Sequence, residues 1–232
     1  MSQRQPEAPP APSGKIRVWD APVRVFHWLL VFCFAGAYLS AESEVWRLLH
    51  VTLGYTLGGL LLFRLVWGLI GSRYARFGSF VRGPKAVWRY LQSLRAHHPE
   101  HHLGHNPAGA VAIVLLIALG LVVTVTGYAT YNDLGPGWLA ALHDLAANAM
   151  LLVVFGHLLG VVMASLQHRE NLVRAMVTGF KSGRPEQGIR RTWAGLAWLI
   201  VLVVLGFWWL QWRSVPAPED ATPAAVLAAP SK

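Results

Sequence analysis

The sequence predicts an all-α, polytopic membrane protein, a four-helix bundle followed by a fifth transmembrane helix. Three observations predict this class. The chain has 232 residues, of which 54% are hydrophobic and only 13% are charged, whereas a soluble domain of this length needs more charge to cover its surface. The apolar residues also gather in long runs instead of amphipathic periods. Finally, the runs are too long and lack the alternation of strands, which excludes a closed β-barrel.

Five of these runs can each cross a hydrocarbon core of about 30 Å as a helix of about 20 residues. Asn106 and Pro107 are typical of an N-cap and a first helical residue, Gly71 ends the second run, and residues 132–137 form a turn. The predicted helices are residues 22–41, 45–70, 107–131, 138–166 and 193–212. We expect a membrane domain over 15–185, a fifth helix in 186–214, and disordered tails at 1–14 and 215–232.

Basic residues predict how the chain is oriented. The net charge is +9, and sixteen Lys and Arg lie before the first run and in the second and fourth connections, against three on the other side. Their place between apolar runs indicates membrane topology and not nucleic-acid binding. We therefore expect a multi-pass protein of the bacterial inner membrane, with a cytoplasmic N-terminus, a periplasmic C-terminus and no cleaved signal peptide.

Four histidines lie within the predicted spans, where ionisable residues are costly and usually functional. They are His27, His50, His143 and His157. His143 and His157 are fourteen residues apart, so they leave the same face of one helix about 21 Å apart. That distance is too long for one shared metal site and suits one site near each membrane surface.

The predicted topology pairs these histidines by depth. His27 and His157 fall in the cytoplasmic half, and His50 and His143 fall in the outer half. Two neutral imidazoles on opposite sides of a plane suit low-spin haem iron, and facing helices of a bundle commonly build such sites. Because Cys33 is the only cysteine and there is no CxxCH motif, any haem is held without thioether bonds.

Other residues lie where a porphyrin needs them. Arg64 is fourteen residues after His50, and it is predicted to bind a propionate at the inner haem. Arg24 and Arg47 are weaker candidates for the inner and the outer haem. The face of the second helix that carries His50 also holds Gly54, Leu57, Leu61 and Gly68, and the small residues among them would let a porphyrin approach the backbone.

Two further features have a functional and a structural interpretation. Met150 lies between the histidines of the fourth helix and could be an axial ligand, but core packing is favoured. A histidine-rich connection resembles a metal-binding tract, but a solvated cytoplasmic loop is favoured. Its members are His97, His98, His101, His102 and His105.

The chain resembles the bacterial cytochrome b561 / Ni,Fe-hydrogenase b-type cytochrome family over residues 15–185. The matching motifs are VWDAPVRVFHW at 18–28, HVTLGY at 50–55, FR at 63–64, WG at 67–68, ARF at 75–77, GHNPAG at 104–109, the two histidines of 138–166, and HRENL at 168–172. The resemblance implies two haems b ligated by the four histidines. It also implies electron transfer between a quinone and a redox partner such as a c-type cytochrome, a hydrogenase or another oxidoreductase.

Two other functions compete with this interpretation. A proton- or metal-translocating transporter could use the intramembrane histidines as a relay, although the second to fourth helices carry no mid-membrane Asp or Glu. A non-redox anchor subunit could use them to join helices. Both predict a colourless protein. The resemblance also leaves open whether the chain has quinone oxidoreductase activity of its own.

Overall fold

Five long helices form the body of the protein, whose computed structural model describes residues 14–96 and 102–214. Each is long and apolar enough to cross a membrane. They are α1 (Ala21–Ser40), α2 (Arg47–Ile70), α5 (Pro107–Tyr131), α6 (Trp138–His168) and α8 (Ala194–Arg213). The prediction for residues 107–131 is confirmed at both ends, and the other predicted ends lie within two residues of those observed.

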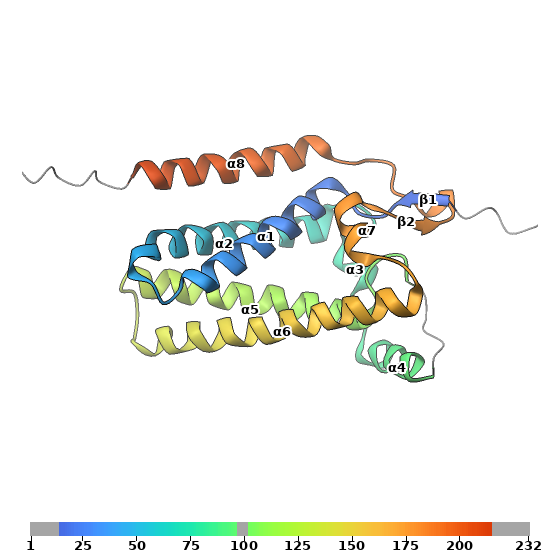
Figure 1. Ribbon diagram of the computed structural model, residues 1–232, viewed down its shortest axis with the longest axis horizontal. Helices are drawn as coiled ribbons and strands as arrows, with labels where there is room; N and C mark the ends of the chain where they lie inside the picture. The colour runs from blue at the N-terminus through green and yellow to red at the C-terminus, as the bar shows by residue number, and fades with distance from the viewer. Residues whose placement is uncertain (1–13, 97–101, 215–232) are drawn as a thin grey trace, which may run out of the picture.

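The shorter elements gather mainly at one end of the bundle, which we call the sheet end (Figure 1). The elements there are β1 (Gly14–Arg17), α3 (Phe77–Phe80), α4 (Pro84–Arg95), α7 (Leu172–Thr178), β2 (Phe180–Gly183) and η2 (Pro185–Gln187). The opposite end, the turn end, carries the short connections from α1 to α2 and from α5 to α6. The first of these contains the 3-10 turn η1 (Glu44–Trp46), which is why α2 begins two residues later than predicted.

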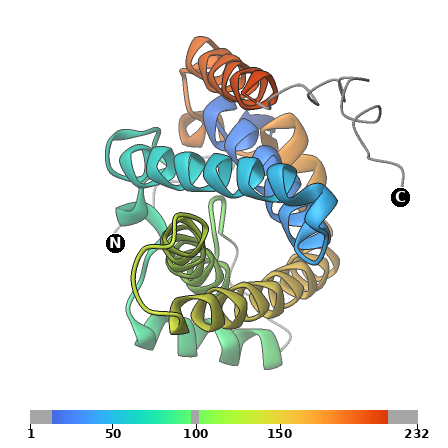
Figure 2. The same cartoon turned by 90° about the vertical axis from the view of Figure 1, so that its left-hand side faces the viewer.

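Four helices surround a common centre, and α8 lies outside them (Figure 2). The neighbours in the ring are α1 with α2, α2 with α5, and α5 with α6. The Tyr38 hydroxyl on α1 donates a hydrogen bond of 2.8 Å to Asn148 Oδ1 on α6. Helix α8 packs on α1 and α2, where Trp208 Nε1 donates to Thr56 Oγ1 at 2.8 Å. The predicted arrangement of a four-helix bundle with a fifth spanning helix is therefore confirmed.

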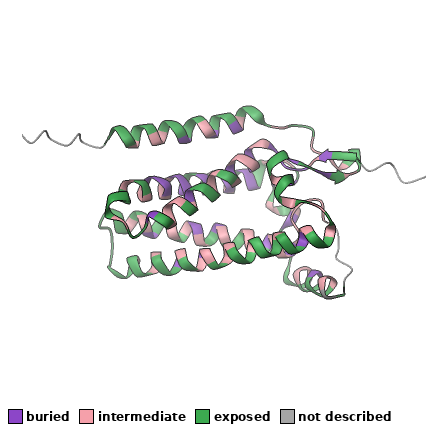
Figure 3. Ribbon diagram, in the orientation of Figure 1, coloured by how far each residue is buried: buried purple, intermediate pink, exposed green. Residues whose placement is uncertain are grey.

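Buried residues concentrate on the inner face of α2, while the outer faces of the bundle are largely exposed and apolar (Figure 3). Leu57 and Leu61 belong to this core together with Met150, which is 1% exposed. Gly120 allows α5 to approach α2 closely, because a Cβ at this position would lie 2.8 Å from Leu61 Cδ1. Met150 thus packs in the core, as favoured from the sequence, and the exposed apolar faces suit contact with lipid.

Asp20 joins the start of α1 to the end of α2. Its side chain is fully buried. Oδ1 accepts a hydrogen bond of 2.7 Å from the Val23 backbone N–H, which caps the helix. Oδ2 accepts a bond of 3.0 Å from Trp67 Nε1. One carboxylate therefore satisfies a helix terminus and a buried indole at once.

A two-stranded antiparallel sheet joins the beginning and the end of the predicted 15–185 segment. Gly14 pairs with Gly183, and Arg17 pairs with Phe180. Lys181 on β2 is buried and forms an ion pair of 2.9 Å with Glu170, which follows α6. The domain boundaries stay a prediction, and the predicted tails lie almost wholly outside the described residues.

Replacing Asp20 should destabilise the sheet end. Asp20→Ala removes a helix cap and leaves the Trp67 indole N–H buried without its acceptor, so the free energy of unfolding should fall by about 2–4 kcal/mol. Denaturant titration of the detergent-solubilised protein measures this change. In a Trp67→Phe background the same substitution should cost less, because only the cap, about 1 kcal/mol, and the attraction to the buried Arg64 are lost. An equal loss in both backgrounds would show that the indole bond contributes nothing.

Candidate functional site

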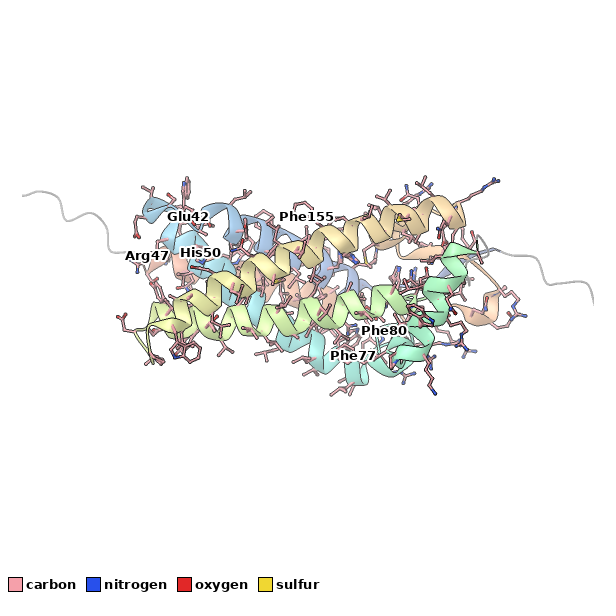
Figure 4. All side chains as sticks on the ribbon, turned by 90° about the horizontal axis from the view of Figure 1, so that it is seen from below. Glu42, Arg47, His50, Phe77, Phe80 and Phe155 are labelled. Carbon is pink, nitrogen blue, oxygen red and sulfur yellow. The ribbon has the colours of Figure 1, made fainter. Side chains whose placement is uncertain are left out.

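The structure brings His50 of α2 and His143 of α6 together near the turn end. The two ring centroids are 6.1 Å apart and the rings are inclined by 70°. His50 and its neighbour Arg47 lie at the opposite end of the bundle from Phe77 and Phe80 (Figure 4). Two imidazoles bound to opposite sides of one metal ion have centroids roughly 6 Å apart, because each metal–nitrogen bond is about 2 Å long. The observed spacing therefore suits one iron between the rings.

Backbone carbonyls of neighbouring helices hold both of these imidazoles. His50 Nδ1 lies 2.8 Å from the Ala37 carbonyl oxygen on α1, and His143 Nδ1 lies 3.0 Å from the Val123 carbonyl oxygen on α5. A carbonyl oxygen can only accept, so each Nδ1 carries a proton and leaves Nε2 as the nitrogen that can bind a metal. This is the arrangement that orients a metal-ligating histidine in proteins.

Two glycines leave room around the imidazoles of His50 and His143, which we call the outer pair. A Cβ at Gly127 on α5 would lie 2.8 Å from His143 Cε1, so only glycine lets the imidazole approach this helix without a shift. Gly54 on α2 is one turn from His50, and no atom of the described residues lies within 4 Å of the place of its missing Cβ. Gly54 therefore remains a position where a flat group can approach α2 closely.

His27 and His157 form the second predicted pair, toward the sheet end. The two imidazoles are close enough to interact electrostatically. The His27 ring packs edge-on against Trp28, with centroids 5.0 Å apart. Its Nδ1 is shielded from solvent and has no hydrogen-bond partner among the described residues. Unlike the outer pair, this pair includes an imidazole whose buried nitrogen lacks a partner in the described part of the chain.

Arg64 of α2 is a buried cation at the sheet end. Its side chain is 3% exposed, and Cζ lies 4.7 Å from the centre of the Phe77 ring. Nη1 has no hydrogen-bond partner among the described residues. Asp20 attracts it electrostatically, but both Asp20 oxygens already accept hydrogen bonds. A buried guanidinium in this state strongly favours an additional anionic partner.

Three of the four residues on the His50 face of α2 pack against neighbouring elements. A Cβ at Gly68 would collide with the Phe77 ring, so this glycine makes room for an aromatic side chain of α3. Leu57 and Leu61 pack into the core beside Gly120. Of the two small residues on this face, Gly68 is therefore covered by α3 and Gly54 is left open.

The two weaker arginine candidates have other contacts. Arg24 Nη1 donates a hydrogen bond of 2.6 Å to the Val177 carbonyl oxygen, which holds α7 against α1. Arg47 is largely exposed and lies 3.5 Å from Glu44, with its guanidinium 5.9 Å from the centre of the Tyr131 ring. Arg24 Nε, like Arg64 Nη1, is shielded from solvent and has no hydrogen-bond partner among the described residues, so the interpretation of Arg24 as a propionate partner stays a prediction, whereas Arg47 has no such buried atom.

His105 is a candidate that the sequence did not single out. Its ring packs between Trp19 and Phe80, with centroids at 4.5 Å and 4.6 Å, and its Nδ1 is shielded from solvent. Burial lowers the pKa of His105 to about 3, so the imidazole is neutral. The solvated-loop interpretation is therefore wrong for this residue. Its place directly before the helix-starting Asn106 and Pro107 was the available signal.

The rest of the histidine-rich connection gives no metal site within the described residues. His97, His98 and His101 lie outside them, and the His102 carbonyl oxygen accepts a hydrogen bond of 3.4 Å from Lys181 Nζ. Across residues 14–96 and 102–214, no three His, Cys, Asp or Glu side chains gather as a metal cluster would require. The sites above are therefore pairs of imidazoles, a ligand set that suits haem iron better than a protein-only metal centre.

Comparisons with known proteins agree with this geometry. The family model described as prokaryotic cytochrome b561 matches residues 18–179. Among curated relatives, a probable Ni/Fe-hydrogenase B-type cytochrome subunit of Azotobacter vinelandii is 27% identical, over 74% of this chain and 91% of its own. A probable Ni/Fe-hydrogenase 1 B-type cytochrome subunit of Escherichia coli K12 is 24% identical, over 71% and 90%. No solved structure matches. The chain belongs to the prokaryotic cytochrome b561 family, whose members are membrane-embedded, haem-b-containing electron-transport proteins.

Proposed function

We propose that this chain is a dihaem electron-transfer subunit that passes electrons between a quinone pool and a redox partner protein. The observation that carries the proposal is the His50–His143 pair, with ring centroids 6.1 Å apart and each Nδ1 directed to a backbone carbonyl. An anchor that only joined helices would gain nothing from placing the two imidazoles at this distance from each other.

Each proposed haem has its own pair of ligands. His50 and His143 hold the outer haem, and His27 and His157 hold the inner haem. Arg64 supplies the positive charge for a propionate of the inner haem, since its buried Nη1 lacks a partner among the described residues and arginine binds carboxylates in a bidentate manner. The open face at Gly54 supports the placing of the outer haem.

The chain's own contribution is to place and insulate the two sites. Bound haem b supplies one-electron redox chemistry that no protein side chain here offers. Carbonyl-bound imidazoles fix ligand orientation, and burial in the bundle together with the charge of Arg64 sets the potential. One site in each leaflet would let electrons cross the bilayer through the protein.

The names of the relatives favour a hydrogenase as the redox partner, since those proteins are described as Ni/Fe-hydrogenase cytochrome subunits. A c-type cytochrome or another oxidoreductase is the alternative. The proposed location is the bacterial inner membrane, with the sheet end and the N-terminus in the cytoplasm. Of the described loops, those at the sheet end carry most of the basic residues, as the positive-inside rule requires.

Removing one ligand should remove one haem. His143→Ala should abolish the outer haem and His157→Ala the inner haem, so each variant should retain about half of the wild-type haem, because each site depends on its own iron–imidazole bonds. The pyridine haemochrome assay on purified protein gives the content, and a redox titration identifies which haem remains. Full haem content in both variants would refute the ligand assignment.

A glycine pair provides the matched control for the outer site. Gly127→Ala adds a methyl group against the His143 ring and should lower only the outer haem. Gly206→Ala, on α8 outside the four-helix ring and with open space around its Cβ position, should leave both.

Electron transfer itself is tested with a quinol. Anaerobic addition of a short-chain quinol to the oxidised protein should produce the absorption spectrum of reduced haem b, because the proposed function exchanges electrons with the quinone pool. The His143→Ala and His157→Ala variants show which haem receives electrons first. A haem spectrum that stays oxidised, in protein that dithionite reduces fully, would contradict the quinone part of the proposal.

A further inference from the structure

His105 and Arg64 both lie close to one aromatic ring at the sheet end. The His105 ring centroid is 4.6 Å from that of Phe80, and Arg64 Cζ is 5.9 Å from the same ring. Figure 4 labels Phe80 and its neighbour Phe77 at this end. His105 also interacts electrostatically with Arg64, His157 and His27. The imidazole therefore belongs to the surroundings of the inner histidine pair, although its sequence position is in a connecting loop.

Two polar atoms in this group have unmet hydrogen-bonding capacity. His105 Nδ1 and Arg64 Nη1 are shielded from solvent, and neither has a hydrogen-bond partner among the described residues. A guanidinium can only donate, and Nδ1 of a neutral imidazole donates in the tautomer that carries its single N–H there. Leaving such donors unpaired is costly. One acceptor group that carries negative charge would satisfy both, and a carboxylate has the lone pairs to do so.

We propose that His105 donates a hydrogen bond from Nδ1 to a haem propionate at the inner site, beside Arg64. This inference rests on the proposed function, because it requires an inner haem. His105 acts as a positioning residue, and it does not ligate iron. A donor to the propionate withdraws negative charge from the neighbourhood of the iron, which favours the reduced state.

Two substitutions separate this role from packing. His105→Phe keeps an aromatic ring between Trp19 and Phe80 but removes the donor, while His105→Gln restores an N–H donor on a flat side chain. Potentiometric titration of the purified holoprotein measures both haem potentials. We expect His105→Phe to lower the inner potential, with about a tenfold change in the oxidised-to-reduced ratio at a fixed potential, which is 59 mV for a one-electron couple.

The outer haem provides the internal control, and His105→Gln should recover most of the shift. Resonance Raman bands of the propionate should change in the Phe variant alone. An unchanged inner potential and unchanged propionate bands in His105→Phe would overturn the inference and leave the proposed function intact. A wild-type protein without an inner haem would instead overturn the proposed function.

A separate observation at the sheet end concerns α4. This helix runs across the bundle axis at the edge of the bundle, seen end-on in Figure 1 and lengthwise in Figure 2. Tyr90 on one face is buried, whereas Trp88 and Leu91 are 61% and 41% exposed. An amphipathic helix lying in the plane of the interface has this pattern.

The exposed face of α4 forms one wall of a groove. The groove has a volume of about 370 Å³ and is lined by Arg82, Pro84, Val87, Trp88, Leu91 and Val111. Four of these residues, from Pro84 to Leu91, follow the i, i+3, i+4, i+7 spacing of one helix face. Val111 belongs to α5, which is a membrane span. The groove therefore connects an interfacial helix to the hydrocarbon layer.

Charge identifies the occupant of this groove. Arg82, Lys85 and Arg89 are exposed within eight residues of one another, and the sequence has no Asp or Glu between Glu44 and Glu100. We infer that the groove holds an acyl chain of an anionic phospholipid, whose phosphate binds Arg82 and Lys85. Apolar walls with basic residues at the rim match both parts of that molecule.

A second groove provides a matched control. It has a volume of about 330 Å³, lies where α6 meets α7, and carries both Arg169 and Glu170. The test is native mass spectrometry of the haem-loaded protein titrated with phosphatidylglycerol and, separately, with phosphatidylcholine. Arg82→Gln with Lys85→Gln should weaken binding of phosphatidylglycerol about 25-fold, at about fivefold for each basic residue. Arg169→Gln should change the affinity for phosphatidylglycerol by less than about twofold from that of the wild-type protein.

The inference requires the wild-type protein to prefer phosphatidylglycerol. Equal binding of both lipids would overturn it, as would an equal loss of phosphatidylglycerol binding in the double variant and in Arg169→Gln. The groove would then be a general lipid contact or a surface that docks a protein.

Discussion

The lack of water inside a bilayer governs this structure, because every polar group in a span needs a partner within the protein. Hydroxyl groups follow the rule locally. Thr56, Thr124 and Thr126 each donate to the carbonyl four residues earlier in the same helix. His50 and His143 follow it across helices, through carbonyls of α1 and α5. A buried polar atom without a hydrogen-bond partner among the described residues therefore indicates a place where another group, such as a cofactor, can supply that partner.

The two histidine pairs are built differently. The outer pair has both Nδ1 atoms satisfied by backbone, and Gly127 sets how closely His143 approaches α5. Ligand orientation there is fixed before any cofactor binds. At the inner pair, the Nδ1 of His27 and the guanidinium of Arg64 have unmet donors within the described residues. Hydrogen bonds to the backbone thus characterise one pair, and unmet hydrogen-bonding capacity characterises the surroundings of the other.

The sheet end joins these features to the membrane surface. The Asp20 carboxylate ties α1 to Trp67 of α2, and the Lys181–Glu170 ion pair ties β2 to the end of α6. At the same end, the His105 ring packs against Trp19 and Phe80. On the outer side of the same end, α4 exposes Trp88 and basic residues toward the interface. The proposed inner haem site and the proposed lipid groove therefore lie at the same end of the bundle.

The sequence by itself determined the five spans, because runs of about 20 apolar residues have few other stable structures in lipid. It also placed His50 level with His143, since helical rise and chain direction follow from local pattern. Only the tertiary structure decided that Phe77 covers Gly68, that Arg24 holds α7, and that His105 is enclosed by Trp19 and Phe80. Those outcomes depend on contacts between residues that are far apart in the chain. Neither the periodicity nor the composition of a helix predicts which distant side chain will pack against one of its faces.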